Sequence, residues 1–196
     1  MKYGMLLVLV LTVLVGCGPT QPVGQTLSSQ TLTESQRLNQ WLDQEFVVYL
    51  DFSPMSKTRL GGKSDYDKLD DPSDAAADAR LAWRRSSVAS LRAEFDRAAL
   101  DAEAKRSYDL WVFMLDRAEA SLAYRRYEYV FGRNGPHTGL PNALINYHKV
   151  DSASDMKAYI ARLEASADYF DAYLERAKLA AAAGIRAPYF DYDVAV

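Results

Sequence analysis

The stretch that decides the fold is 152–184, SASDMKAYIARLEASADYFDAYLERAKLAAAAG. From Met156 to Ala181 its apolar residues recur mostly in alternating steps of three and four, the spacing of one helix face. Ser152 is placed to cap the start of this helix, and Gly184 is a suitable residue to end it. At 1.5 Å per residue, about 30 residues predict one uninterrupted helix roughly 45 Å long.

The segments upstream follow the same period. Thr33 and Gln36 have the spacing of a capping box, and Ser73 and Asp101 are suitable caps for the next two helices. Together with the apolar stripes, these caps predict helices over 34–50, 73–100, 101–127 and, beginning at Pro141, over 141 to 146 or 147. Because no stretch alternates with period two, the predicted fold is all-α: a bundle of long antiparallel helices with an aromatic core.

Two local features qualify this bundle. Residues 110–115, LWVFML, are apolar all round, which predicts the most buried segment of the domain. Arg84 and Arg85 interrupt the apolar face of the helix over 73–100. We expect them to mark either an exposed end of that face or an ion-pair site.

The composition argues against a nucleic-acid-binding protein and against a fold held by disulfides. The formal net charge is −3 with both signs interspersed, whereas a nucleic-acid-binding protein needs a basic face. A single cysteine permits no intrachain disulfide, so stability must come from packing. Thirteen Tyr, seven Phe and three Trp supply much of the apolar area for it.

The N-terminus carries an export signal. Lys2 precedes an apolar run over 5–15, which is too short to span a bilayer but suits a signal peptide. The run ends in LVGC at 14–17, which resembles a bacterial lipobox and implies cleavage before Cys17 and acylation of that residue. An ordinary secretory signal with a chance cysteine is the alternative.

The lipobox sets the expected location and domain order. Gly18, rather than Asp, points to the periplasmic face of the outer membrane if the host has two membranes. We therefore expect a signal peptide over 1–16, a lipidated Cys17 with a flexible tether over 17–32, and a helical domain over 33–196.

Motifs for catalysis are missing from the sequence. His137 and His148 are eleven positions apart and no HExxH occurs, so no metal site is predicted. No GxSxG elbow is present, and the glycines at 132 and 135 lack the Lys-Ser/Thr of a phosphate loop. The acidic loop over 65–74 lacks the order of an EF-hand, which favours a solvated loop over a cation site.

The best ligand-facing candidate is the aromatic and basic segment 124–131, YRRYEYVF, because Tyr and Arg are favoured anchors at interfaces. A helix end that covers the core explains the same pattern.

Two segments together resemble a known family. Residues 135–141, GPHTGLP, run on into LINYH at 144–148, and an earlier stretch runs from Gly61-Gly62 to YDKLDD at 66–71. Both resemble stretches of a bacterial lipoprotein family, domain-of-unknown-function family 885, over about 38–188. Its members look like helical zinc peptidases, which implies a zincin-like architecture.

The resemblance carries no catalytic residue to this chain. The zinc site of the complete family member is an HExxPGH-type helix in a later part of the chain, and this sequence contains none. We therefore expect a non-catalytic N-terminal portion without its own cofactor, anchored to a membrane, whose partners are the missing catalytic portion, another protein or peptides. The residues for which we expect a cleft or structural role are Tyr127, Arg133, His137, Tyr147 and His148. The alternative is a self-sufficient periplasmic helical lipoprotein that binds or scaffolds a partner.

Overall fold

The structure is a computed structural model that describes residues 31–191. The predicted signal peptide, Cys17 and nearly all of the tether lie outside the described residues. The helical unit begins at Leu32. Within the described part every regular element is a helix, which confirms the all-α prediction.

The helices follow one another with short connections, apart from two longer loops before α3 and α5. They are α1 (Glu34–Asp51), α2 (Pro54–Arg59), α3 (Asp74–Glu94), η1 (Arg97–Ala99), α4 (Ala102–Ser121), η2 (Leu122–Tyr124), α5 (Pro136–Asn146), α6 (Ala153–Glu164) and α7 (Ser166–Ala182).

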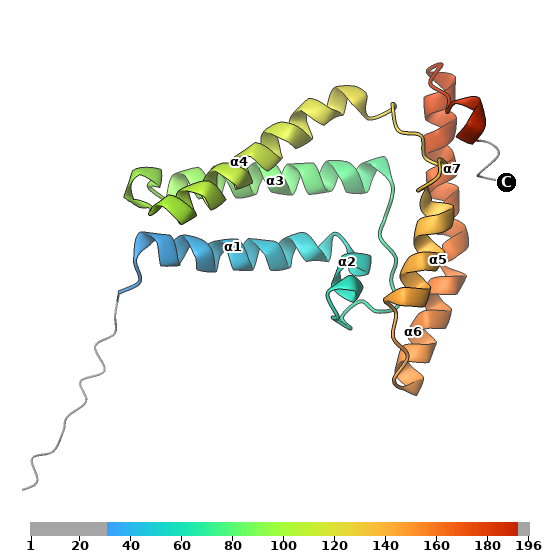
Figure 1. The fold of residues 1–196 in the computed structure, drawn as a ribbon, viewed down its shortest axis with the longest axis horizontal. Helices are drawn as coiled ribbons and strands as arrows, with labels where there is room; N and C mark the ends of the chain where they lie inside the picture. Colours follow the sequence, from blue (N-terminus) through green and yellow to red (C-terminus); the bar gives the residue numbers. More distant parts are fainter. Residues whose placement is uncertain (1–30, 192–196) are drawn as a thin grey trace, which may run out of the picture. The chain divides into compact units, whose positions relative to one another are not determined.

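Helices α1, α3 and α4 form one antiparallel group, in which α3 runs opposite to the other two (Figure 1). Their shared core contains Leu38 of α1, Leu91 of α3 and Tyr108 of α4. Trp41 joins them with its ring edge-on to Phe95, at 5.7 Å between centroids, and to Trp111, at 6.2 Å. This is the aromatic core that the composition predicted.

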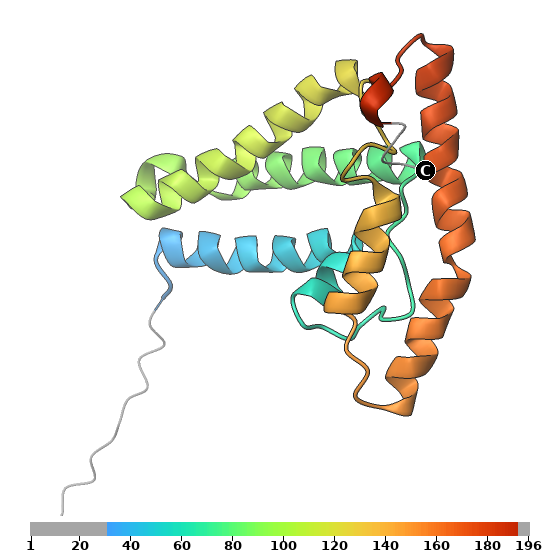
Figure 2. The same ribbon diagram turned by 45° about the vertical axis from the view of Figure 1, so that its right-hand side comes forward.

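Helices α2, α5, α6 and α7 form a second group. α5 runs antiparallel to α6 and α7, which continue one another (Figures 1 and 2). Its core consists of Met55 from α2 and Leu140, Ala143 and Leu144 from α5, with rings of α6 and α7 packed against them.

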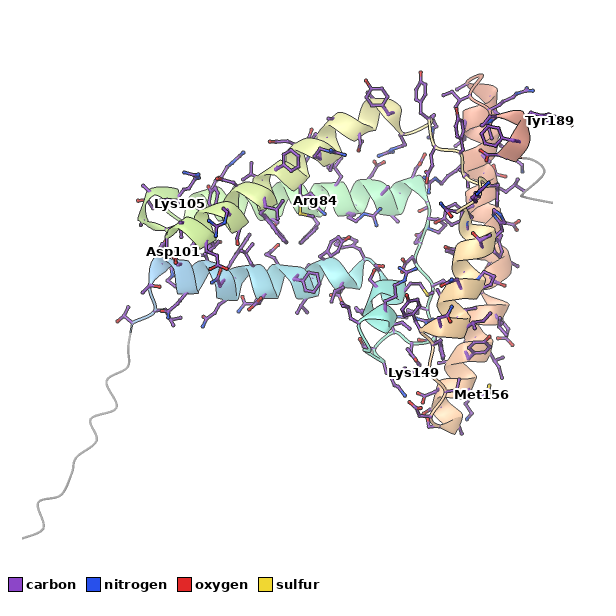
Figure 3. The ribbon with its side chains drawn as sticks, viewed as in Figure 1. Arg84, Asp101, Lys105, Lys149, Met156 and Tyr189 are labelled. Carbon is purple, nitrogen blue, oxygen red and sulfur yellow. The ribbon has the colours of Figure 1, made fainter. Side chains whose placement is uncertain are left out.

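The predicted caps are confirmed. Thr33 and Gln36 form the capping box, with bonds of 3.2 and 2.9 Å, and Ser73 and Ser152 cap α3 and α6. Asp101 caps α4, and its own amide donates to the Ser35 hydroxyl at 3.0 Å, which joins the start of α4 to α1 (Figure 3). Gly184 adopts a φ of +80° just after α7.

Several predicted boundaries are wrong. α3 ends at Glu94, because Phe95 takes an extended backbone and turns into the core. α4 ends at Ser121 rather than near 127. Ser53 and Pro54 begin the unpredicted α2, and Pro136, not Pro141, begins α5.

The predicted single helix over 152–184 is also interrupted, at Ala165. The Ser166 hydroxyl donates to the Leu163 carbonyl at 2.5 Å, a local bond of the kind that bends helices. Most of the predicted apolar stripe of α6 faces outward, since Met156, Ile160 and Leu163 are exposed, and Tyr159 alone of these four packs against the core. The buried face of α6 instead carries Asp155 and Arg162.

The prediction for 110–115 is wrong as well. Leu110 and Phe113 expose 57% and 53% of their surface, and only Trp111 and Val112 of this segment pack against the core. Arg85 forms the expected ion pair, with Glu119 at 2.7 Å. Arg84 is neither at an exposed end nor in an ion pair within the described residues: it is only 8% exposed.

Candidate functional site

The segment between α4 and α5 is fastened to the start of α3 by two ion pairs. Arg125 pairs with Asp78 and Arg126 with Asp74. The pKa of each carboxyl is lowered below its usual value, mainly by the hydrogen bond from its arginine. The expected aromatic and basic patch is therefore divided: its arginines are engaged with α3, whereas Tyr127 is exposed.

A tight turn then leads into α5. The amide of Gly132 donates to the Tyr129 carbonyl at 3.1 Å, and that of Gly135 to the Gly132 carbonyl at 2.8 Å. A Cβ on Gly135 would lie 2.6 Å from the Val130 carbonyl oxygen. No side chain fits at this distance, so glycine is required where the turn meets the helix.

This turn forms one wall of a polar cleft of about 450 Å³. The opposite walls come from the end of α2, the loop before α3 and one face of α7. The cleft is lined by Met55, Arg59, Asp70, Glu128, Tyr129, Val130, Gly132, Arg133, Asn134, Gly135, Pro136, Gly139, Leu140, Ala143, Tyr169, Tyr173 and Asp191.

The chemistry of the cleft is suited to binding. Arg59 and Arg133 are exposed and form no ion pair within the described residues, so both guanidinium groups can meet a carboxylate. Tyr169 and Tyr173 pack edge-on at 5.0 Å between centroids. Burial, and secondarily a hydrogen bond with Tyr173, raises the pKa of Tyr169 above its usual value.

Asp70 forms part of the cleft floor and also positions α2. Its carboxylate accepts from the Ser53 hydroxyl at 2.8 Å and from the Met55 amide at 2.9 Å. Both oxygens are thus used to hold the N-terminus of α2, where a negative charge is favourable. The loop over 61–71 and the turn over 132–139 therefore meet at one cleft.

A second polar centre lies beneath the loop over 60–72. Arg162 of α6 is fully buried. Its guanidinium donates to the Lys68 carbonyl at 2.8 Å, to the Thr58 hydroxyl at 2.8 Å and to Nδ1 of His148 at 3.0 Å. The ring of Tyr66 covers it at 5.2 Å, so the buried cation has several partners.

These contacts assign the tautomer of His148. Because a guanidinium can only donate, Nδ1 must accept, and Nε2 then donates to the Asp155 carbonyl at 3.1 Å. The ring also stacks on Tyr66 at 3.9 Å. The pKa of His148 is lowered, mainly by burial, which agrees with a neutral ring.

Ion pairs at the rim hold the same loop. Lys63 pairs with Asp155 at 2.8 Å, and Lys57 with Asp65 at 2.6 Å. Hydrogen bonds from these lysines, joined at Asp65 by Lys68, lower the pKa of Asp155 and of Asp65 to about 2. The acidic loop is thus balanced by lysines.

The predicted candidates do not share one site. Arg133 lines the cleft, whereas His137 does not and lies against Phe131, at 6.2 Å between ring centroids. Both ring nitrogens of His137 are buried and have no hydrogen-bond partner among the described residues. Tyr127 projects outward beside Tyr124. Tyr147 borders a separate hollow near Lys63, and His148 lies in the Arg162 centre.

Sequence reasoning missed Arg59, Tyr169, Tyr173 and Arg162. The predicted apolar stripe included neither of the two tyrosines. A usable signal existed for Arg162: it lies four and seven positions from residues 158 and 155, on the face of α6 that bears Asp155 and Tyr159. Tyr159 belongs both to this face and to the predicted apolar stripe. The stripe was taken as the buried face because its other members in α6, Met156, Ile160 and Leu163, are apolar.

The described residues do not fit the zinc ion that the resemblance implies. No group of three His, Cys, Asp or Glu in the described part is arranged to hold a metal. Both ring nitrogens of His148 are already engaged. In the same part of the chain, none of the helices combines the length and the apolar character needed to cross a bilayer.

Comparison with known families gives one match. The model described as "Bacterial protein of unknown function (DUF885)" matches residues 54–196. This covers α2 through α7, both loops of the cleft and the Arg162 centre. Neither the curated proteins nor the solved structures gave a match.

Proposed function

Because the chain belongs to the bacterial family of unknown function DUF885, we propose that its helical domain is a non-catalytic, peptide-binding part of an exported, lipid-anchored zinc-peptidase-like protein. The catalytic motif of such a protein would lie outside these residues. The cleft beside the turn over 132–135 is the proposed peptide-binding surface.

One observation carries this proposal. The two segments on which the family resemblance rests, 61–71 and 135–148, are distant in sequence but converge in the structure: Asp70 and Gly135 line one cleft, and Tyr66 stacks on His148. If each of these two segments only stabilised its own neighbourhood, the two would not have to contact each other. Their convergence supports a shared surface.

The lining of the cleft supports a peptide ligand rather than a reaction. Arg59 and Arg133 can bind the carboxylate of a peptide terminus or acidic side chain, and Tyr169 and Tyr173 offer an aromatic surface beside them. The lining offers no cysteine or serine nucleophile. We therefore assign the cleft to binding and positioning.

The binding role is tested with the full chain carrying Cys17→Ser and a labelled hexaalanine peptide, followed by fluorescence anisotropy. We expect Arg133→Gln to weaken binding by about tenfold, the effect of losing one charge-assisted contact. Arg92→Gln, at an exposed position in the last turn of α3, should leave it unchanged. Equal affinities for both variants would refute the assignment.

The non-catalytic role is tested by elemental analysis of the tag-free full chain. We expect no stoichiometric zinc and no peptide cleavage. One tightly bound zinc per chain would contradict the proposal.

The lipid anchor is tested in the host. Cys17→Ser should move the protein from the membrane fraction to the soluble fraction, because two or three acyl chains are needed for stable anchoring. Unchanged fractionation would instead favour an ordinary signal peptide. An immunoblot of host membranes against the segment 152–184 adds the mass of the native product, and a band several times heavier than this chain would indicate that it is part of a larger protein.

A self-sufficient helical lipoprotein that scaffolds a partner is the second candidate. The capped helices and the Arg162 centre favour it, because they form a satisfied network without help from other chains. It predicts a single cooperative thermal transition, whereas a part of a larger domain should melt broadly and bind hydrophobic dye.

A further inference from the structure

In the other helical group, α4 diverges from α3 (Figures 1 and 2), and a second groove is lined by residues of both helices. Its volume is about 570 Å³. One wall is the face of α3 that bears Ala77, Leu81 and Arg84, and the other is the exposed apolar face of α4, with Leu110 and Phe113.

Arg84 lies at the base of this groove, midway along α3 (Figure 3). Although it is only 8% exposed, its Nη1 has no hydrogen-bond partner, and no carboxylate among the described residues pairs with it. It packs instead against the rings of Tyr49 and Trp83, each at 5.7 Å from the guanidinium carbon. A buried charge without a counter-ion is costly, so its retention needs an explanation.

The contrast with Arg162 shows that the fold can satisfy a buried arginine. Arg162 has strong bonds to Lys68, Thr58 and His148, and every nitrogen of its guanidinium has a partner. Arg84 has only aromatic neighbours. The unpartnered nitrogen therefore distinguishes Arg84 from Arg162, the other buried arginine.

The charged residues of the groove lining that form no ion pair within the described residues are all positive. Arg80 and Arg117 also line it and form no ion pair within the described residues. Arg176 contributes a further positive charge, but its ion pair with Glu128 uses the single acid of the lining. The groove is thus apolar on the α4 side and cationic at its base and rim.

We propose that this groove is the docking site of an amphipathic helix that brings a carboxylate to Arg84. The α4 wall extends from Leu110 to Leu122, about 18 Å, which matches roughly three turns of a docked helix. Exposed apolar residues along α4 match the apolar face of such a helix, and the unpaired arginines match its acidic residue. Apart from Glu128, which lines both, this site uses other residues than the peptide cleft, and it does not depend on that cleft.

The test uses the full chain with Cys17→Ser and a pair of labelled amphipathic peptides of about 18 residues. Both carry leucines at i, i+3, i+4 and i+7 spacing with alanine and glutamine elsewhere, and they differ only in a central glutamate or glutamine on the leucine stripe. We expect anisotropy to show at least about tenfold tighter binding of the glutamate peptide. Arg84→Met should abolish this preference, whereas Arg92→Met should keep it.

Equal affinity of the two peptides, a preference that survives Arg84→Met, or no binding at all would overturn the proposal. The melting temperature without peptide provides the second measurement. Since Arg84→Met removes an unpaired buried charge, the variant should melt at the same or a higher temperature than the parent. A large decrease would show that Arg84 serves the core instead. Arg84→Lys, which keeps the charge, should retain part of the preference for glutamate.

Discussion

Replacing Arg162 by methionine tests whether the loop over 60–72 is held by the buried guanidinium. Methionine keeps the length of the apolar stem but removes every donor. The Thr58 hydroxyl keeps a partner, because it also donates to the Pro54 carbonyl at 3.1 Å. The Lys68 carbonyl and Nδ1 of His148 are left without their donor.

The magnitude follows from these two groups. Each stranded buried acceptor costs about 1–3 kcal/mol, so the pair costs roughly 2–6 kcal/mol. Removing the buried charge returns part of that cost, because the desolvation of the guanidinium disappears. We expect the free energy of unfolding to fall by about 3 kcal/mol, a large share of the 5–15 kcal/mol usual for a domain.

The assay is urea unfolding of the full chain with Cys17→Ser, followed by far-ultraviolet circular dichroism, together with hydrogen exchange. The loss of protection should be largest over 61–71, since Arg162 holds the Lys68 carbonyl directly. The matched control is Arg92→Met, which should change stability by no more than about 0.5 kcal/mol. A decrease below about 1 kcal/mol with unchanged exchange over 61–71 would refute the reasoning.

Two further predictions concern single side chains. Burial lowers the pKa of His148 in the folded state, so this imidazole binds a proton more tightly in the unfolded chain. The stability due to neutral His148 is therefore complete above about pH 6.5, and it declines as the pH falls below that value. Urea midpoints between about pH 7.5 and 5.5 should therefore decrease more for the parent than for His148→Asn, and parallel decreases would contradict this origin. Gly135→Ala should destabilise the chain by about 1–3 kcal/mol because its Cβ would lie 2.6 Å from the Val130 carbonyl. Gly139→Ala, whose Cβ would contact nothing within 4 Å, should instead stabilise α5 by up to about 1 kcal/mol. Thermal unfolding of both variants measures the two effects. Equal changes in melting temperature would contradict both predictions.

Four helix starts were predictable because capping is local, whereas those of α2, α5 and α7 were not. Thr33, Ser73, Asp101 and Ser152 each bond to backbone amides two or three residues away, so the signal and its effect lie in one short window. Gly184 ended its helix for the same reason. The class of fold followed from these local signals together with the helical period.

Burial was not predictable in the same way, because it depends on what covers a face. The segment 110–115 is apolar all round, yet only one side of α4 meets α1 and α3, so Leu110 and Phe113 remain exposed. Along α6 the error has the opposite sense. Arg162 is buried because a loop from about a hundred positions earlier lies over it, and periodicity within α6 contains no information about that loop.

The candidate site was predictable only in part. The segments that resemble the family meet at the cleft, and Arg133 lies in its lining. Arg59, Tyr169 and Tyr173 come from α2 and α7, and their contribution depends on the packing of α5 between those helices. His137, Tyr147 and His148 are close to Arg133 in sequence but have different surroundings. Arg133 precedes α5 and His137 lies in its first turn, whereas Tyr147 and His148 follow its last residue.

The bonds of Arg162 also determine when parts of the chain can acquire their final form. Its partners Thr58 and Lys68 lie 104 and 94 positions earlier. At a synthesis rate of 5–20 residues per second, the loop leaves the ribosome roughly 5–20 s before the residue that fixes it. Through that interval the segment 60–72 has only the contacts of Asp65 and Asp70 with α2 and the residue before it. It is therefore open to proteases and chaperones until α6 arrives.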